Sequence, residues 1–118
     1  MESRTYSGSC HCGKVKYEVT TDLASVIECN CSICSRAGYL LTFVPADKVK
    51  VLSGLDSLKS YHFNKMHVDH QFCTNCGVRP FGQGKGPGGA PMYAINVRCL
   101  ADVDPKSLQI QQVDGRSA

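Results

Sequence analysis

Seven of the eight cysteines lie in three short clusters, and their spacing limits what the chain can fold into. The densest cluster runs from Cys29 through Cys31 to Cys34 and places three thiols in six residues. A structural zinc site takes four protein ligands, whereas a zinc that does chemistry usually has three and leaves one position for water or substrate. Three thiols this close together therefore predict a metal site with an open coordination position.

The spacing of Cys29 and Cys31 favours metal binding over a disulfide. On an extended chain their side chains leave the same face with α-carbons about 6.6 Å apart, at the far edge of what a disulfide spans. Two thiolates on one zinc need sulfur atoms only about 3.7 Å apart, which a slight bend of the strand allows. Cys31 and Cys34 add the Cys-x-x-Cys spacing that is typical of metal-binding turns.

A second metal site is predicted from the two remaining pairs of cysteines. Cys73 and Cys76 form a Cys-x-x-Cys turn followed by Gly77, which suits backbone N–H groups that face the thiolates. Cys10 and Cys12 are the other pair, and the four thiols together make a closed tetrahedral site.

A competing arrangement would combine Cys29 and Cys31 with the Cys-x-x-Cys turn. It leaves Cys34 unused beside its own neighbours and is therefore the less economical assignment. Cys99 belongs to neither site, and its place on an alternating apolar face predicts a small core residue.

Histidine is the other common zinc ligand, and His62, His67 and His70 are candidates for a fourth ligand of the three-cysteine cluster. His70 shares an alternating face with apolar side chains, which favours packing over metal binding. His11 lies between two cysteines with its ring expected on the opposite face, as a surface residue. Arg36 either holds a substrate carboxylate near the metal or is a solvated turn residue.

Length and composition predict one domain over residues 1–118, since 118 residues with 42% hydrophobic content suffice for a single core. Residues 1–9 lack the apolar run of a secretory signal, and no stretch is long enough to span a membrane. We therefore expect a cytoplasmic protein, in which a high density of cysteines indicates metal binding rather than disulfides.

The formal net charge of +3 does not indicate a nucleic-acid partner. Seven thiolates and two divalent zinc ions would bring this charge to zero. The lysines and arginines are also scattered, without the basic run that binds phosphates.

Apolar alternation predicts a mainly β fold of short antiparallel sheets tied together by zinc-binding knuckles. The segments with strand character are residues 14–20, 23–27, 39–44, 57–63, 66–72 and 92–100. We expect a small-residue turn at 35–38, a mobile hairpin or lid at the glycine-rich 82–89, a helical turn at 104–108, and a tail at 114–118.

The motifs resemble those of the glutathione-dependent formaldehyde-activating enzyme family, which also includes the centromere protein V domain. The resemblance extends from about residue 7 to residue 115. It rests on Gly8-Ser9-Cys10-His11-Cys12-Gly13, Cys29-Asn30-Cys31-Ser32-Ile33-Cys34 with Gly38, Phe72-Cys73-Thr74-Asn75-Cys76-Gly77, and Asn96-Val97-Arg98 before Leu100.

This resemblance implies two zinc ions per chain and a carbon–sulfur lyase reaction that forms S-hydroxymethylglutathione. In the family the first zinc is structural and the second is of the catalytic type and associated with glutathione. The implied structural ligands are Cys10, Cys12, Cys73 and Cys76, and the implied catalytic-site ligands are Cys29, Cys31 and Cys34.

Two functional hypotheses follow. In the first, the chain is an enzyme that takes a small thiol such as glutathione at the open zinc position and presents it to formaldehyde or another small electrophile. In the second, both zinc ions are structural and the domain is a non-catalytic module that binds another protein. A fourth protein ligand at the three-cysteine cluster would favour the second hypothesis, because a filled site cannot accept substrate.

Overall fold

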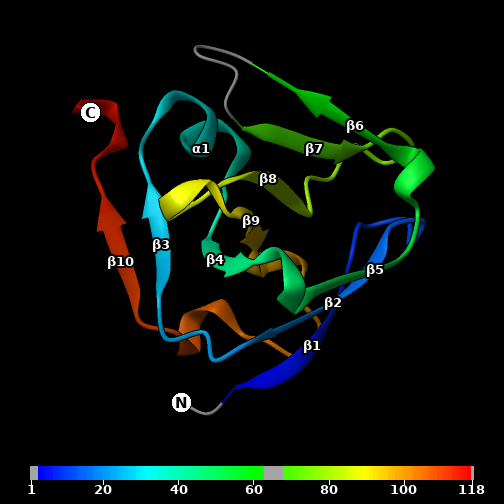
Figure 1. Ribbon diagram of the computed structural model, residues 1–118. Coiled ribbons are helices and arrows are strands. Elements are labelled where there is room, and N and C mark those ends of the chain that lie inside the picture. The colour runs from blue at the N-terminus through cyan, green and yellow to red at the C-terminus, as the bar shows by residue number, and fades with distance from the viewer. Residues whose placement is uncertain (1–2, 63–67, 118) are drawn as a thin grey trace.

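The computed structural model describes residues 3–62 and 68–117, which form a mainly β fold of two sheets, as the sequence predicts (Figure 1). A three-stranded sheet has the order β1-β2-β5, and a seven-stranded sheet has the order β10-β3-β4-β9-β8-β7-β6. The strands are β1 (Arg4–Ser9), β2 (Lys16–Thr21), β3 (Val26–Cys29), β4 (Leu41–Pro45), β5 (Val49–Ser53), β6 (Leu58–Tyr61), β7 (Asp69–Cys73), β8 (Phe81–Lys85), β9 (Pro91–Asn96) and β10 (Ile110–Val113).

One short α-helix and several single 3₁₀ turns connect these strands. The helix α1 (Ser32–Ala37) joins β3 to β4. The 3₁₀ turns are Ala46–Lys48, Leu55–Ser57, Pro87–Gly89, Val97–Cys99, Pro105–Ser107 and Gly115–Ser117. No helix among the described residues has the length and apolar character needed to cross a membrane.

The main core joins the two sheets through aromatic side chains. Tyr17 of β2 and Phe81 of β8 are fully buried, and their rings meet edge to face with centroids 5.0 Å apart. Phe81 also meets Tyr93 of β9 edge to face at 5.2 Å. Val19 and Ile95 fill the space around them without exposed surface. This contact fixes the position of the three-stranded sheet against one face of the larger sheet.

The register of β4 and β9 defines the opposite face of the large sheet. Phe43 pairs with Ala94 and Leu41 pairs with Asn96, so these side chains project on the same side. Their neighbours Val44 and Ile95 alternate into the main core. We call the side that carries Leu41, Phe43 and Ala94 the outer face.

The predicted antiparallel pairing has one exception among the described strands. β10 runs parallel to β3, with Ile110 opposite Val26 and Val113 opposite Cys29. Parallel neighbours end at the same edge of a sheet. The residues that follow β10 are therefore carried to the place where β3 delivers Cys29.

Three local predictions are wrong in their boundaries. The turn expected at 35–38 is the last part of α1, which ends at Gly38 with φ 72°. The strand expected at 92–100 stops at Asn96, because the Asn96 side chain accepts a hydrogen bond from the Arg98 N–H and caps a 3₁₀ turn. The glycine-rich 82–89 is a hairpin as expected, but its first half is strand β8.

Three further expectations concern the turn after Asp104, the tail at 114–118 and the strands around residue 65. The helical turn expected after Asp104 is the 3₁₀ turn Pro105–Ser107, capped by the Asp104 side chain. The tail expected at 114–118 includes the 3₁₀ turn Gly115–Ser117, in which Gly115 lies against Cys29 and Cys31. The ends of the two strands expected around residue 65, together with His67, lie outside the described residues.

Candidate metal centres

The first cluster brings together Cys10, Cys12, Cys73 and Cys76, whose sulfur atoms all lie within 4.8 Å of one another. The Sγ atoms of Cys10 and Cys12 are 3.6 Å apart, and those of Cys12 and Cys73 are 3.7 Å apart. These separations agree with the distance of about 3.7 Å expected for two thiolates on one tetrahedral zinc. The four side chains could therefore hold a metal ion without rearrangement of the chain.

Two tight turns shape this cluster. In the second turn Gly77 donates its N–H to the Cys73 carbonyl at 2.8 Å and has φ 80°. In the first turn Cys10 donates its N–H to the Val15 carbonyl, and the Val15 N–H points to the Cys10 sulfur at 3.4 Å. Glycine suits the second turn because it adopts positive φ without a steric penalty.

The surroundings favour the thiolate at two of the four cysteines. Hydrogen bonds from the backbone N–H groups of Val78 and Cys12 lower the pKa of Cys76 to about 6. The Asn75 side chain and the Lys14 backbone lower the pKa of Cys12. Deprotonated sulfur is the form that binds a metal, so each of the two turns contributes one cysteine whose surroundings favour metal binding.

The four-cysteine cluster lies where the two sheets meet. Cys10 is 4% exposed and Cys73 is fully buried, and both belong to the main core. Cys10 follows the first strand of the small sheet, while Cys73 ends β7 of the large sheet. A metal ion bound here would tie the two sheets together.

The second cluster brings together Cys29, Cys31 and Cys34, whose sulfur atoms also lie within 4.8 Å of one another. Cys29 ends β3, Cys31 is the N-cap residue of α1, and Cys34 lies in the first turn of the helix. The Cys31 N–H points to the Cys29 sulfur at 3.4 Å, and the Cys34 N–H points to the Cys31 sulfur at 3.5 Å. A helical turn, and not the simple turn expected, returns Cys34 to the other two thiols.

Cys31 and Cys34 differ in their tendency to ionise. Burial opposes ionisation of Cys31, but hydrogen bonds from the backbone and side chain of Cys34 and from Cys29 give a net lowering of its pKa. Burial and the hydrogen bond with Cys31 raise the pKa of Cys34 well above its usual range. A bound cation would offset the effect of burial by stabilising the thiolate form of its ligands.

Within the described residues, no histidine or carboxylate joins the three sulfur atoms at that distance. His62 instead pairs with Asp69 through Nε2 and Oδ1, and His70 lies half-buried on β7. His11 is exposed and belongs to neither cluster, as expected for a surface residue. His67 lies outside the described part of the chain.

Two further residues have local structural roles. Arg36 is exposed, and its Nη1 donates to the Ser32 carbonyl of its own helix at 2.9 Å. This contact within its own helix agrees with a surface arginine, and binding of a substrate carboxylate by Arg36 stays a prediction. Cys99 is half-buried beside the Arg79 carbonyl, and burial raises its pKa to about 11. It lies outside the main core, because the strand expected to carry it ends at Asn96 and Cys99 falls in the 3₁₀ turn that follows.

The three-cysteine cluster packs on the outer face of the large sheet. Cys34 forms a small buried group with Tyr39 and Leu41, and Ala94 of β9 packs against this group. The site is therefore separate from the main core, on the other side of β4 and β9.

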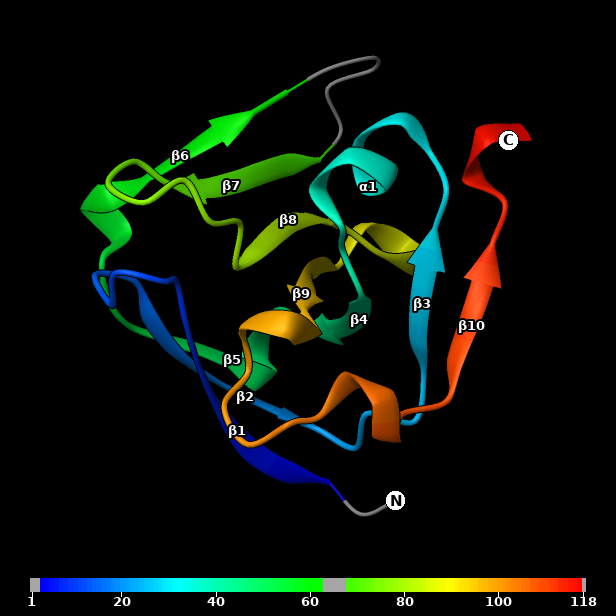
Figure 2. The ribbon, with the colours of Figure 1, turned by 180° about the vertical axis from the view of Figure 1, so that it is seen from behind.

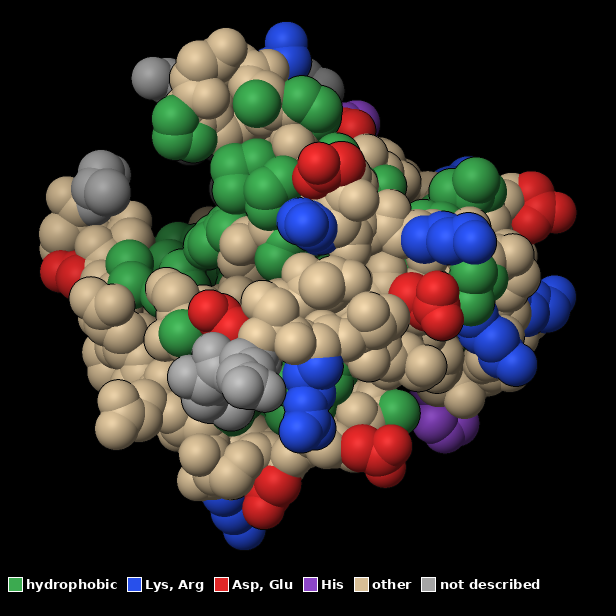
Figure 3. Space-filling view, turned by 60° about the horizontal axis from the view of Figure 1, so that its bottom comes forward, with side chains coloured by type: hydrophobic (Ala, Val, Ile, Leu, Met, Phe, Trp, Pro, Cys, Tyr) green, Lys and Arg blue, Asp and Glu red, His purple; other side chains and the backbone are tan. Residues whose placement is uncertain are grey.

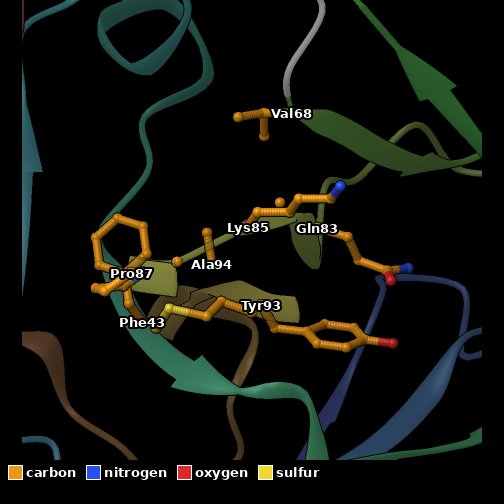
Figure 4. A pocket seen from close by; sticks show the side chains of 10 residues that line it. Phe43, Val68, Gln83, Lys85, Pro87, Tyr93 and Ala94 are labelled. Atoms are coloured by element: carbon orange, nitrogen blue, oxygen red, sulfur yellow. The ribbon is translucent and has the colours of Figure 1, made fainter. Parts of the chain in front are cut away.

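A pocket of about 780 Å³ lies beside this group on the same face (Figure 4). Ala94 lines the pocket and also packs against the group that contains Cys34. Phe43, Val68 and Met92 provide apolar walls, and Lys85 is the one charged side chain among the described residues that line it. Gly84 pairs with Met92 and faces the pocket with no side chain to fill it.

The pocket residues do not form a motif that marks them as a binding site in the sequence. The sequence around Phe43 predicts an ordinary strand residue, yet the structure leaves Phe43 52% exposed. An available signal was the alternation of Gly82 and Gly84 in strand β8, because glycine inside a strand often marks a place where a ligand approaches.

The surface in Figure 3 carries basic and acidic side chains side by side, without a continuous basic stripe on the face shown.

Two comparisons with known proteins agree with the geometry. The sequence model of the family described as glutathione-dependent formaldehyde-activating enzyme matches residues 5–112. The fold is similar to the crystal structure of a Rhodobacter sphaeroides protein, with a TM-score of 0.80 and 29% sequence identity. That similarity covers 91% of this chain and 99% of the other.

Proposed function

Since the chain belongs to the glutathione-dependent formaldehyde-activating enzyme family, we propose that it is a zinc-dependent enzyme of the carbon–sulfur lyase type. Its substrates would be a small thiol like glutathione and formaldehyde or another small electrophile. The observation that carries this proposal is a cluster of three thiols, with no fourth protein ligand among the described residues, beside a pocket on the same face.

The donor sets suit two zinc ions with different roles. Four thiolates would close the first site, whereas Cys29, Cys31 and Cys34 would leave one tetrahedral position of the second site for an external thiol. Zinc with three thiolates has a net charge of −1, and a fourth thiolate would make it −2, the same as at the closed site. The added charge is therefore one that this fold already accommodates elsewhere.

When bound, zinc would supply ionisation of the incoming thiol at neutral pH. A free thiol of pKa near 8.5 is a few per cent ionised at neutral pH, so this gain is at most about thirtyfold, or about 2 kcal/mol. Binding to a metal also reduces the nucleophilicity of the sulfur. Most of any rate enhancement must then come from holding thiol and electrophile together.

The residues of the pocket would provide this orientation. Apolar side chains such as Phe43 and Met92 would pack against the substrate and exclude water, and the Lys85 amine could hold a carboxylate of a glutathione-like thiol. In the reaction the sulfur forms a bond to the carbonyl carbon, the carbon–oxygen double bond becomes single, and the thiol proton ends on the oxygen. The step involves no oxidation and no leaving group.

We expect the protein loaded with two zinc ions to bind one glutathione per chain in a calorimetric titration. The Cys34→Ser variant should lose this binding, because it removes a ligand of the open site. Absence of binding at millimolar glutathione, or equal binding by the variant, would contradict the proposed enzyme and leave a structural module as the better interpretation.

Two lysine variants separate the pocket from the metal in the same titration. Lys85→Ala should weaken glutathione binding by about fivefold, the size of one partly exposed ion pair, and leave binding of uncharged 2-mercaptoethanol unchanged. Lys48→Ala is the matched control, because Lys48 is exposed on a 3₁₀ turn and does not line the pocket. Equal effects of the two variants on glutathione would exclude the pocket as its binding site.

A further inference from the structure

The segment that follows β10 folds over the loop that carries Cys29 and Cys31. Both views of the ribbon place the end of β10 beside the end of β3 and the start of α1 (Figures 1 and 2). The parallel register sets Val113 opposite Cys29, and the 3₁₀ turn Gly115–Ser117 follows directly. We call residues 113–117 the C-terminal clamp.

Asn30, between the two cysteines, makes three hydrogen bonds to the clamp. Its backbone N–H donates to the Val113 carbonyl at 3.1 Å. Its side-chain Nδ2 donates to Asp114 Oδ1 at 3.0 Å, and its Oδ1 accepts from the Arg116 N–H at 2.9 Å. Because both the oxygen and the nitrogen of the amide are used, the side chain has one orientation, and the loop is tied to the clamp at three points.

Gly115 of the clamp lies directly against two metal-binding side chains. A β-carbon at this position would be 2.5 Å from the Cys29 sulfur and 3.2 Å from the Cys31 β-carbon. A side chain at residue 115 would therefore displace either the clamp or the Cys29 sulfur. Only glycine allows the backbone to approach the thiols this closely.

From these contacts we infer that Asn30 and Gly115 are positioning residues that hold Cys29 and Cys31 in the geometry needed to bind the second metal ion. The inference rests on the proposed metal site at the three cysteines. The family model matches residues 5–112, so Asn30 lies within the matched range and the clamp lies beyond it.

The physical reason lies in how the three ligands are supported. Cys34 is fixed by the helix and by packing against Tyr39 and Leu41. Cys29 and Cys31 are only partly buried against the same group, and they lie on either side of the exposed Asn30 at the junction of a strand and a helix. Residues that orient metal ligands typically change metal affinity by about 10- to 100-fold when they are replaced.

The test is the zinc affinity of each site, measured in the full-length chain by competition with a chromophoric chelator. The wild-type protein should bind two zinc ions, and Cys34→Ser identifies which step belongs to the three-cysteine site. Asn30→Ala and Gly115→Ala should each weaken that step by about 10- to 100-fold and leave the other step unchanged. The absorption bands of cobalt bound at the site should shift in both variants, reporting altered thiolate geometry.

Three further variants test the individual contacts of Asn30 with the clamp. Arg116→Ala should behave like the wild type, because the contact uses the backbone N–H of residue 116. Asn30→Asp places a carboxylate against Asp114 and should weaken binding, whereas the exchange Asn30→Asp with Asp114→Asn restores one donor and should recover it.

The outcomes distinguish this inference from the proposed function. Wild-type zinc affinity in both Asn30→Ala and Gly115→Ala would overturn the clamp and leave the proposed enzyme intact. Equal weakening at both metal sites would also overturn it, because it indicates loss of fold. A wild-type protein that binds only one zinc ion would instead contradict the proposed metal site itself.

Discussion

Replacement of Cys76 by serine is expected to give insoluble or unfolded protein, the largest effect of any single substitution considered. The first metal site joins Cys10 and Cys12 to ligands more than sixty residues later, so a bound zinc closes a long loop. Binding free energy at such a site becomes folding free energy, on the order of 10 kcal/mol. The loss should be larger still because two other cysteines of this site, Cys10 and the fully buried Cys73, belong to the main core.

Cys34→Ser is the matched comparison, because it also replaces one thiol of a metal cluster. Cys29, Cys31 and Cys34 span only six residues, so their metal constrains the unfolded chain little. This variant should remain folded with one zinc per chain and lose any thiol-dependent activity. Melting temperature and zinc content should be measured for both variants, and equal damage from the two substitutions would contradict the assignment of structural and functional sites.

Gly54→Ala should have the second-largest effect, because the new side chain would clash with the backbone of the turn that carries Cys10 and Cys12. Gly54 follows β5 with φ 90°, and a β-carbon there would lie 2.3 Å from the Lys14 carbonyl oxygen and 2.7 Å from the Val15 α-carbon. Both contacts are backbone and cannot rotate away. We expect a loss of about 3–5 kcal/mol in the free energy of unfolding, from left-handed strain and overpacking together.

Gly77→Ala provides the control for backbone strain without a clash. Gly77 has a similar φ of 80°, but nothing lies within 4 Å of the position of its β-carbon. Its loss should be limited to the left-handed strain, about 1–2 kcal/mol. Denaturant unfolding of both zinc-loaded variants measures the difference. Equal losses would show that the close approach of Gly54 to Lys14 and Val15 does not contribute to the loss of stability.

The grouping of the cysteines could be predicted because it depends on local spacing and on a simple count. Cys-x-Cys and Cys-x-x-Cys place thiols close together whatever the rest of the chain does. The structure gathers the same seven cysteines into the same two groups, although metal binding by them stays a prediction. The mainly β architecture was equally accessible, because alternation such as that of Val15, Tyr17 and Val19 depends only on neighbours in the sequence.

Features that depend on long-range pairing could not be predicted. The parallel register of Val113 with Cys29 joins segments 84 residues apart, and the polar residues after it resemble an ordinary tail. The helix α1 begins at Ser32 with Cys31 as its N-cap residue, and cysteine is not among the usual N-cap residues. The pocket is formed only when register places Phe43, Ala94 and Gly84 on one face of the sheet.

The central claim is that the three-cysteine site has an open metal position that accepts an external thiol. Zinc K-edge X-ray absorption, recorded on the two-zinc protein without and with saturating glutathione, tests it most directly. Seven cysteine ligands shared by two ions predict an average of three and a half sulfur atoms per zinc in the resting protein, with the remainder oxygen from water. Glutathione should remove the oxygen shell at about 2.0 Å and raise the average to four sulfur atoms at about 2.3 Å. A resting spectrum that glutathione leaves unchanged would mean that the site does not accept this thiol, and would contradict the account.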